Sequence, residues 1–291
     1  MSTDPIFVLS TQRSGSTLLR VMLAGHPGLF SPPELRLLEF ATMRERESAL
    51  GPCNFGACAK HTCDQRHGLQ RALMELYQLD DMSSRQMIDA MLDRNDTTTD
   101  AYDVLMRAAA PRRLLDKSTS YATRFETMEK SKRLFPQARY IHLHRHPLAV
   151  IESIVRNGFE KSPALAESAW TSRNDNILRF LAGVDQERQI RVPYELLVAE
   201  PERTLRSICA FLNIEFHPDV LTPYEGTRMT DGITPETLPP GDWNFRNRDR
   251  INPLQADAWR DLDLPRTLDE KTLAISAALA YELDAAVASR P

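Results

Sequence analysis

Residues 6–17 constrain the fold of this chain more than any other segment. The apolar run Ile-Phe-Val-Leu stops at a turn rich in hydroxyl side chains, and a helical pattern of apolar residues starts directly afterwards at Leu18. A buried strand that feeds a helix through such a turn points the first free N–H groups of the helix at one place, where they and the helix dipole favour an anion. The turn residues that add donors or allow close backbone approach are Arg13, Ser14, Gly15, Ser16 and Thr17. We therefore predict a phosphate-binding loop at this turn.

This turn does not match the two common glycine-rich phosphate loops. A nucleoside-triphosphatase loop needs a glycine, four residues and then Gly-Lys-Ser/Thr, whereas here no glycine lies upstream and the basic residue precedes Gly15. A dinucleotide-binding fingerprint is also missing, because Gly15 has no glycine partner in the turn. On the turn alone, an ordinary strand–turn–helix with a surface Arg13 is an equally good interpretation.

Short apolar strands alternate with helical patterns along the chain, which is typical of an α/β fold with a parallel β-sheet flanked by helices. We expect the strands near residues 6–10, 28–31, 113–117, 139–144 and 188–193. Each strand leads into a polar residue, and such folds bind ligands at the carboxyl ends of their strands. Helical patterns cover residues 66–110, 163–183 and 269–288. We expect residues 1–291 to form a single domain with a helical cap insertion at about residues 40–110.

The segment Thr11-Gln12-Arg13-Ser14-Gly15-Ser16-Thr17 resembles the phosphosulfate-binding loop of sulfotransferases, which use 3′-phosphoadenosine-5′-phosphosulfate (PAPS). Four further segments resemble that family in the order it requires, and they extend the likeness to about residue 215. They are Pro33-Glu34-Leu35-Arg36, Asp116-Lys117-Ser118-Thr119, Arg145-His146-Pro147 with Ser153, and Tyr194-Glu195-Leu196-Leu197. The resemblance implies a PAPS-dependent O-sulfotransferase with a P-loop-like phosphosulfate-binding loop, which releases 3′-phosphoadenosine-5′-phosphate (PAP) and needs no metal.

A narrower likeness concerns the acceptor. Residues 20–38, 140–147, 149–153 and 241–245 resemble the sulfotransferase domains of olefin-forming polyketide synthases of the curacin synthase and olefin synthase type. This likeness implies that the acceptor is the β-hydroxyl of an acyl chain held by phosphopantetheine on an acyl carrier protein. A downstream thioesterase would then use the sulfate as a leaving group and give a terminal alkene. The alternative is a free small-molecule alcohol, sugar or tyrosine acceptor. Leu and Met residues in the cap insertion slightly favour an acyl chain, although such residues are more often core.

The resemblance also assigns roles to residues of this sequence. Sulfuryl transfer depends on positioning and on stabilising the charge that develops on the departing oxygen. By the resemblance, Arg13 and Lys117 stabilise that oxygen, Ser14, Gly15, Ser16 and Thr17 hold the phosphosulfate, Arg145 and Ser153 bind the 3′-phosphate, and Tyr194 contacts adenine. A surface lysine remains an alternative for Lys117, and a core or surface side chain remains one for Tyr194.

An alcohol acceptor needs a base, because its proton leaves as its oxygen attacks. Glu34 matches the carboxylate of the sulfotransferases that share this loop. The run Pro32-Pro33-Glu34 also reads as the start of a helix, where an acid is favoured anyway, and both interpretations can hold at once. Histidine is the base in other branches of the family, so His26, His142 and His144 are alternatives, although the last two alternate on a strand expected to be buried.

Residues 222–253 lack periodicity and contain several prolines, so we predict a lid over the cofactor rather than simple disorder. The lid carries Arg246, Arg248 and Arg250, which fit three roles equally well. They can bind cofactor phosphate, contact an acidic carrier protein and its phosphopantetheine arm, or form a solvated charged loop.

Composition restricts the partners and the compartment. The formal net charge of −4 indicates no general affinity for nucleic acid or an anionic membrane. No apolar run approaches the roughly 20 residues that span a bilayer, and a first strand starting at Ile6 leaves no room for a signal peptide. We therefore expect a cytoplasmic protein.

The cysteines invite a metal-site interpretation. Cys53, Cys58 and Cys63 lie near His61 and His67, but their spacing matches none of the common zinc patterns. We favour a flexible loop with incidental thiols over a structural zinc. Two further functions compete with sulfuryl transfer: an inactive nucleotide-binding protein and a P-loop kinase. Intact candidate residues disfavour the first, and the missing Gly-Lys-Ser/Thr motif disfavours the second.

Overall fold

A computed structural model describes residues 4–50, 63–226, 228, 248–262 and 268–281, without the side chains of residues 63–66. The strands of these residues form a five-stranded sheet with the order β2-β3-β1-β4-β5, and every neighbouring pair is parallel. The strands are β1 Ile6–Leu9, β2 Leu29–Phe30, β3 Arg113–Asp116, β4 Arg139–His144 and β5 Gln189–Pro193. The predicted α/β fold and parallel sheet are confirmed, and each strand lies within one residue of its predicted start.

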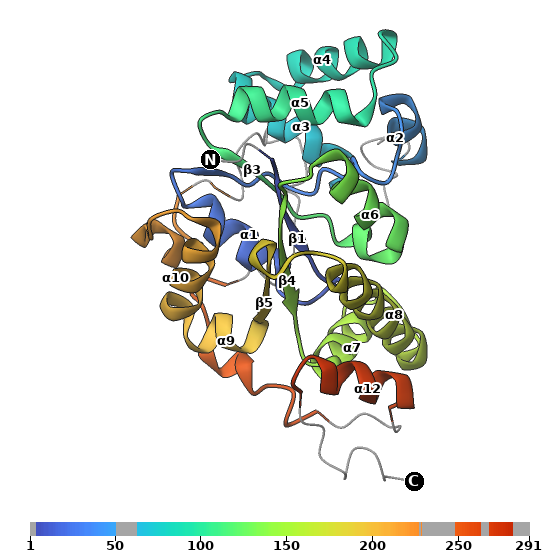
Figure 1. The fold of residues 1–291 in the computed structure, drawn as a ribbon, viewed down its shortest axis with the longest axis vertical. Helices are drawn as coiled ribbons and strands as arrows, with labels where there is room; N and C mark the ends of the chain where they lie inside the picture. Colours follow the sequence, from blue (N-terminus) through green and yellow to red (C-terminus); the bar gives the residue numbers. More distant parts are fainter. Residues whose placement is uncertain (1–3, 51–62, 227, 229–247, 263–267, 282–291) are drawn as a thin grey trace.

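Helices cover both faces of the sheet (Figure 1). On one side lie α1 Ser16–Ala24, α9 Tyr194–Ala199 and α10 Pro201–Leu212. On the other lie α6 Phe125–Leu134, α7 Pro147–Arg156, α8 Pro163–Ala182 and α12 Glu270–Ala278. Short 3₁₀ segments are η1 Thr119–Thr123, η2 Gln186–Arg188, η3 Pro218–Leu221 and η4 Pro253–Ala256.

Strand β1 shows why both faces are covered. All four of its residues are buried, and successive side chains of a strand point to opposite faces. Ile6 and Val8 join an apolar cluster with residues of α1, α9 and α10. Phe7 and Leu9 join a second cluster, built with residues of α5, α6 and α8. This continuously apolar strand is therefore buried on both faces, as is usual for central parallel strands.

Among the described residues, four helices are inserted between β2 and β3, above the sheet in Figure 1. They are α2 Met43–Leu50, α3 Cys63–Tyr77, α4 Asp81–Asp93 and α5 Thr98–Ala109. Capping residues in the sequence start two of them: the Asp80 side chain accepts from the Ser83 N–H, and Thr97 and Asp100 form a capping box.

Most of the large apolar side chains in the described part of this insertion form core rather than a chamber. Leu73, Met91 and Leu105 are fully buried in the cluster that also contains Phe7 and Leu9. They pack among these helices and against the sheet. The Leu and Met content of the insertion therefore gives no support to an acyl-chain acceptor.

Several predictions fall partly outside the described residues. The described part of the last helix is α12, and residues 282–291 of the predicted helix at 269–288 lie outside. Residue 227 and residues 229–247 of the predicted lid also lie outside, together with Arg246, Cys53, Cys58 and His61. Among the described residues, none of the helices is both long and apolar enough to span a bilayer, and no cluster of His, Cys, Asp and Glu could hold a metal ion.

Candidate active site

The loop after β1 adopts the strand–turn–helix geometry that the sequence predicts. Gly15 has φ +85° and immediately precedes α1, and its carbonyl accepts the Leu19 N–H at 3.1 Å. A Cβ added to Gly15 would lie 2.3 Å from Cδ2 of Tyr194. Glycine is therefore required here twice, by the left-handed backbone and by the tyrosine ring packed against it.

The hydroxyl groups of the loop lie at the start of α1. The Ser14 hydroxyl is buried and hydrogen bonds with that of Thr11 at 2.6 Å. Ser16 is also buried, whereas Thr17 is partly exposed. These residues surround a helix N-terminus, which favours an anion.

Three residues from separate parts of the chain meet at this loop. The Arg13 Nε donates to the Ser153 hydroxyl on α7 at 3.1 Å, and Nη1 of Arg145 donates to the Arg13 carbonyl at 3.2 Å. The Arg145 guanidinium also lies 4.4 Å from the centroid of the Tyr194 ring. The structure thus brings together Arg13, Arg145, Ser153 and Tyr194, which follow or flank different strands.

The chemistry of this group fits an anionic nucleotide. Nε of Arg145 is buried and has no hydrogen-bond partner among the described residues. A buried guanidinium N–H without an acceptor is costly, and a phosphate oxygen is the acceptor that its geometry suits best. The loop, Arg145 and the N-terminus of α1 could together hold a phosphorylated and sulfated nucleotide.

Glu34 and Lys117 form an ion pair beside the loop. The Lys117 ammonium donates to Oε1 of Glu34 at 2.7 Å, and the Thr119 hydroxyl donates to the same oxygen at 3.3 Å. Lys117 follows β3 and is only 5% exposed, so it is not a surface lysine. No described residue donates to Oε2 of Glu34, which leaves that oxygen able to accept a proton.

The predicted helix start at Pro32-Pro33-Glu34 is wrong. Residues 31–40 are irregular, and Arg36 has φ +50°. Side-chain oxygens accept the backbone N–H groups of this segment. Ser118 Oγ accepts the Arg36 N–H at 3.1 Å, and the Tyr121 hydroxyl accepts the Leu37 N–H at 2.9 Å. Glu34 is therefore held by tertiary contacts and not by a helix dipole.

A buried network that the sequence reasoning missed supports this segment. Asp116, fully buried at the end of β3, accepts from the hydroxyls of Tyr102, Tyr121 and Ser118. Burial raises the pKa of Asp116 to about 6, although the three hydroxyl donors act in the opposite direction. An acid directly before Lys117 in an apolar strand is the only sequence signal that pointed to this network.

Each of the three candidate histidines lies within hydrogen-bond distance of another residue through at least one ring nitrogen. Nδ1 of His26 accepts from the Gly28 N–H at 2.9 Å, and its Nε2 lies 2.6 Å from the Glu215 carbonyl. His142 and His144 are buried on β4, beside Asn174 and Tyr281 respectively. Burial lowers the pKa of His142 to about 4 and that of His144 to about 2. Glu34 is therefore better placed as a base than any of the three.

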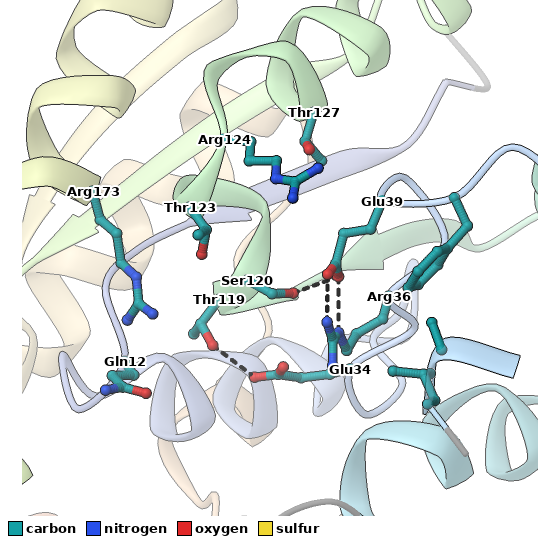
Figure 2. A pocket seen from close by; sticks show the side chains of 13 residues that line it. Gln12, Glu34, Arg36, Glu39, Thr119, Ser120, Thr123, Arg124, Thr127 and Arg173 are labelled. Atoms are coloured by element: carbon teal, nitrogen blue, oxygen red, sulfur yellow. Dashed lines mark hydrogen bonds and ion pairs between the residues drawn. The ribbon is translucent and has the colours of Figure 1, made fainter. Parts of the chain in front are cut away.

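A cavity of about 540 Å³ opens beside Glu34 (Figure 2). Gln12 of the loop lines it, together with residues of η1, α2 and α8. Most of the lining is polar, and α2 is the one inserted helix whose described residues reach it, through Ala49 and Leu50. Arg124 and Arg173 also line the cavity, and sequence reasoning missed both because each lies in a helical region without a recognisable motif.

Comparisons with known proteins place the chain in a family. The model described as "Sulfotransferase family" matches residues 5–218. The structure of a sulfotransferase domain from the curacin biosynthetic pathway matches with a TM-score of 0.88 and 42% identity, covering 96% of this chain and 98% of that one. The sulfotransferase domain of the Synechococcus PCC 7002 olefin synthase matches with a TM-score of 0.87 and 44% identity, covering 97% and 96%.

Curated proteins match over less of their length. Nodulation protein NoeE of Sinorhizobium fredii is 30% identical over 275 residues, which cover 87% of this chain and 59% of that protein. The chain spans between 52% and 59% of the length of the first curated relatives it matches.

Proposed function

The chain belongs to the sulfotransferase family, and on that premise we propose that it transfers the sulfuryl group of PAPS to the β-hydroxyl of an acyl chain on an acyl carrier protein. The observation that carries this proposal is the similarity, along nearly the whole chain, to sulfotransferase domains of the curacin pathway and of an olefin synthase. The arrangement of the candidate site is consistent with it.

The donor would bind at the loop after β1. The N–H groups at the start of α1, the loop hydroxyls and Arg13 would hold the phosphosulfate. Arg145 and Ser153 would hold the 3′-phosphate, since the unsatisfied Nε of Arg145 needs an acceptor. The Tyr194 ring would border the adenine, with one face against the Arg145 guanidinium.

The ion pair suggests how the base and the cation cooperate. Oε2 of Glu34 would take the proton of the acceptor hydroxyl as its oxygen forms the new S–O bond, and the bond from sulfur to the bridging phosphate oxygen would break. Protonation neutralises Glu34 and weakens its hold on Lys117. The Lys117 ammonium would then be free to stabilise the departing oxygen together with Arg13.

The partners follow from the proposed acceptor. A carrier protein would present the hydroxyl on its phosphopantetheine arm, and a thioesterase would consume the sulfated product by decarboxylative elimination of sulfate. The mostly polar lining of the cavity favours a second candidate acceptor, a free alcohol, sugar or tyrosine.

The test is transfer from PAPS to a 3-hydroxyacyl carrier protein, followed by intact-protein mass spectrometry, with the same acyl group on a small thiol in parallel. We expect the carrier-bound acyl group to gain one sulfuryl group. Sulfation of small alcohols but not of the carrier would support the second candidate. No transfer, with tight PAP binding by calorimetry, would disprove both acceptors but keep the donor site; absence of PAP binding would also disprove the donor site.

A further inference from the structure

The cavity beside Glu34 has an excess of positive charge on its described lining. Both of its carboxylates are paired with cations, as Glu34–Lys117 and Glu39–Arg36. Arg124 and Arg173 line the same cavity. Neither guanidinium has a hydrogen-bond or ion-pair partner within the part of the chain that the structure describes. Because the two pairs are neutral, the described lining keeps two guanidinium charges that have no ion-pair partner of their own.

The two arginines reach the cavity from different elements. Arg173 comes from α8 and extends toward Gln12 of the phosphate-binding loop, whereas Arg124 precedes α6 and lies beside Thr127 (Figure 2). Arg124 is exposed and Arg173 is half-buried. An anion that enters the cavity would therefore meet one arginine near the solvent and another closer to the reacting pair.

The surroundings of Arg173 show that its charge is only partly compensated. Burial is the main influence on its pKa and lowers it from the usual value, and the Glu34 carboxylate acts in the opposite direction. Glu34 is itself bound to Lys117 and Thr119. A partly desolvated guanidinium is stabilised when an oxyanion accepts its N–H groups, preferably two at once.

The donor is not the obvious source of that oxyanion. Of the phosphate-binding loop, only Gln12 lines the cavity, whereas Arg13, Gly15, Arg145 and Ser153 do not. The anionic groups of the donor would lie among those residues. The negative charge that would pair with Arg124 and Arg173 should therefore come from the acceptor.

We propose that the charges of Arg124 and Arg173 favour an anionic acceptor, so that the cavity selects acceptors that carry a phosphate or a carboxylate. The inference rests on the proposed function, because it takes the cavity beside Glu34 as the acceptor site. Two sources supply this chemistry: the phosphate of a phosphopantetheine arm and the carboxylate of a free 3-hydroxy acid.

The experiment compares three acceptors that carry the same 3-hydroxyacyl chain, with PAPS at saturation. They are the neutral acyl-pantetheine, the acyl-phosphopantetheine and the free 3-hydroxy acid. We expect kcat/KM for at least one anionic acceptor to exceed that of the neutral acceptor by about tenfold or more, and the preferred anion identifies the source. The double variant Arg124→Gln/Arg173→Gln should lose this preference, so that its kcat/KM values for the anionic and neutral acceptors become similar.

The control is Arg107→Gln, because Arg107 is a strongly exposed arginine on α5, outside the cavity. It should retain the preference, and an unchanged affinity for PAP should show that each variant is folded. Equal use of all three acceptors by wild type, or a preference that survives in the double variant, would overturn the anion subsite. The sulfated products would in that case still support sulfuryl transfer to a hydroxyacyl acceptor.

A binding measurement keeps the two proposals separable when no acceptor is sulfated. The proposed function then fails, and calorimetry of the same three compounds with PAP-loaded protein decides the subsite. Tighter binding of an anionic compound by wild type and Arg107→Gln, but not by the double variant, supports the subsite. Equal affinities of the three compounds for wild type reject it.

Discussion

Lys117 and Glu34 are joined by a 2.7 Å contact although 83 positions separate them in the chain. Lys117 follows β3, and Glu34 lies in the irregular segment after β2, so the contact unites the ends of two neighbouring strands. It places a cation and a candidate base side by side at the edge of a polar cavity. In the proposed mechanism, proton transfer to Glu34 releases the Lys117 ammonium. Removal of the acceptor proton is thereby linked to stabilisation of the departing oxygen.

Glu34→Gln should lower catalysis without changing donor binding. The amide keeps the size of the side chain but cannot accept the proton, so we expect kcat to fall by about 100-fold or more. The Kd for PAP should stay within about twofold, because the donor loop is unchanged. Steady-state kinetics and calorimetry measure the two effects, and Glu126→Gln, an exposed acid on α6, is the control. Undiminished turnover would transfer the role of base to another group.

Arg13→Ala should remove charge stabilisation at the departing oxygen and lower kcat by about 100-fold or more. Arg13→Lys retains a positive charge but loses the Nε contact to Ser153, so we expect intermediate activity. Single-turnover transfer assays would measure both. Near-normal turnover of the alanine variant would rule out a catalytic role for Arg13.

Gly15→Ala should weaken PAP binding by more than the strain of a left-handed backbone accounts for. Gly158 is a matched control, because it has φ +71° and an added Cβ there meets nothing within 4 Å. Gly158→Ala should cost about 1–2 kcal/mol of stability through backbone strain. Gly15→Ala has comparable strain and also forces Tyr194 to move, so its affinity for PAP should fall by about tenfold or more, a loss we do not expect in Gly158→Ala. Thermal unfolding and calorimetry compare the pair, and similar PAP affinities would contradict the steric argument.

Asp116 should make folding stability depend on pH in a defined window. Its pKa rises from 3.8 to about 6 on folding, mainly because of burial. Between these values the folded protein holds a proton that the unfolded chain has released, so the contribution is present at low pH and is lost as pH rises through about 6. A shift of about two units corresponds to roughly 3 kcal/mol.

Asp116→Asn should remove this contribution. Urea unfolding of wild type and variant between about pH 4 and 7 would measure the difference in unfolding free energy. We expect that difference to shift in favour of the variant as pH rises. Titration of the buried histidines occurs in both proteins and cancels in the comparison. Parallel pH curves would show that Asp116 does not titrate in this range.

The sequence predicted the elements whose signals are local. The five described strands are apolar runs that lead into polar residues. Because the strands are parallel, Arg13, Lys117, Arg145 and Tyr194 all lie at the carboxyl-terminal ends of strands. The same local reasoning failed at Glu34, where Pro-Pro-Glu suggested a helix. The decisive contacts there come from Ser118 and Tyr121, more than eighty positions away, and no local pattern contains them.

The arginines of the cavity illustrate a second limit. Arg173 lies in a regular helical pattern and Arg124 lies at the start of another helix, so each resembles an ordinary charged surface residue. Their significance depends on what they lack among the described residues, which is an ion-pair partner. That property belongs to the assembled cavity, and the order of residues along the chain does not encode it in any short motif.

The chain leaves the sheet for the insertion through the segment that carries Glu34, and it returns through β3, which Lys117 follows. The ion pair between these two residues joins the segments at both ends of the insertion. Helix α5 contacts the same place, because its Tyr102 hydroxyl donates to Asp116, the residue directly before Lys117. A change in how α5 packs would therefore reach the ion pair, so the insertion and the site cannot be altered independently of each other.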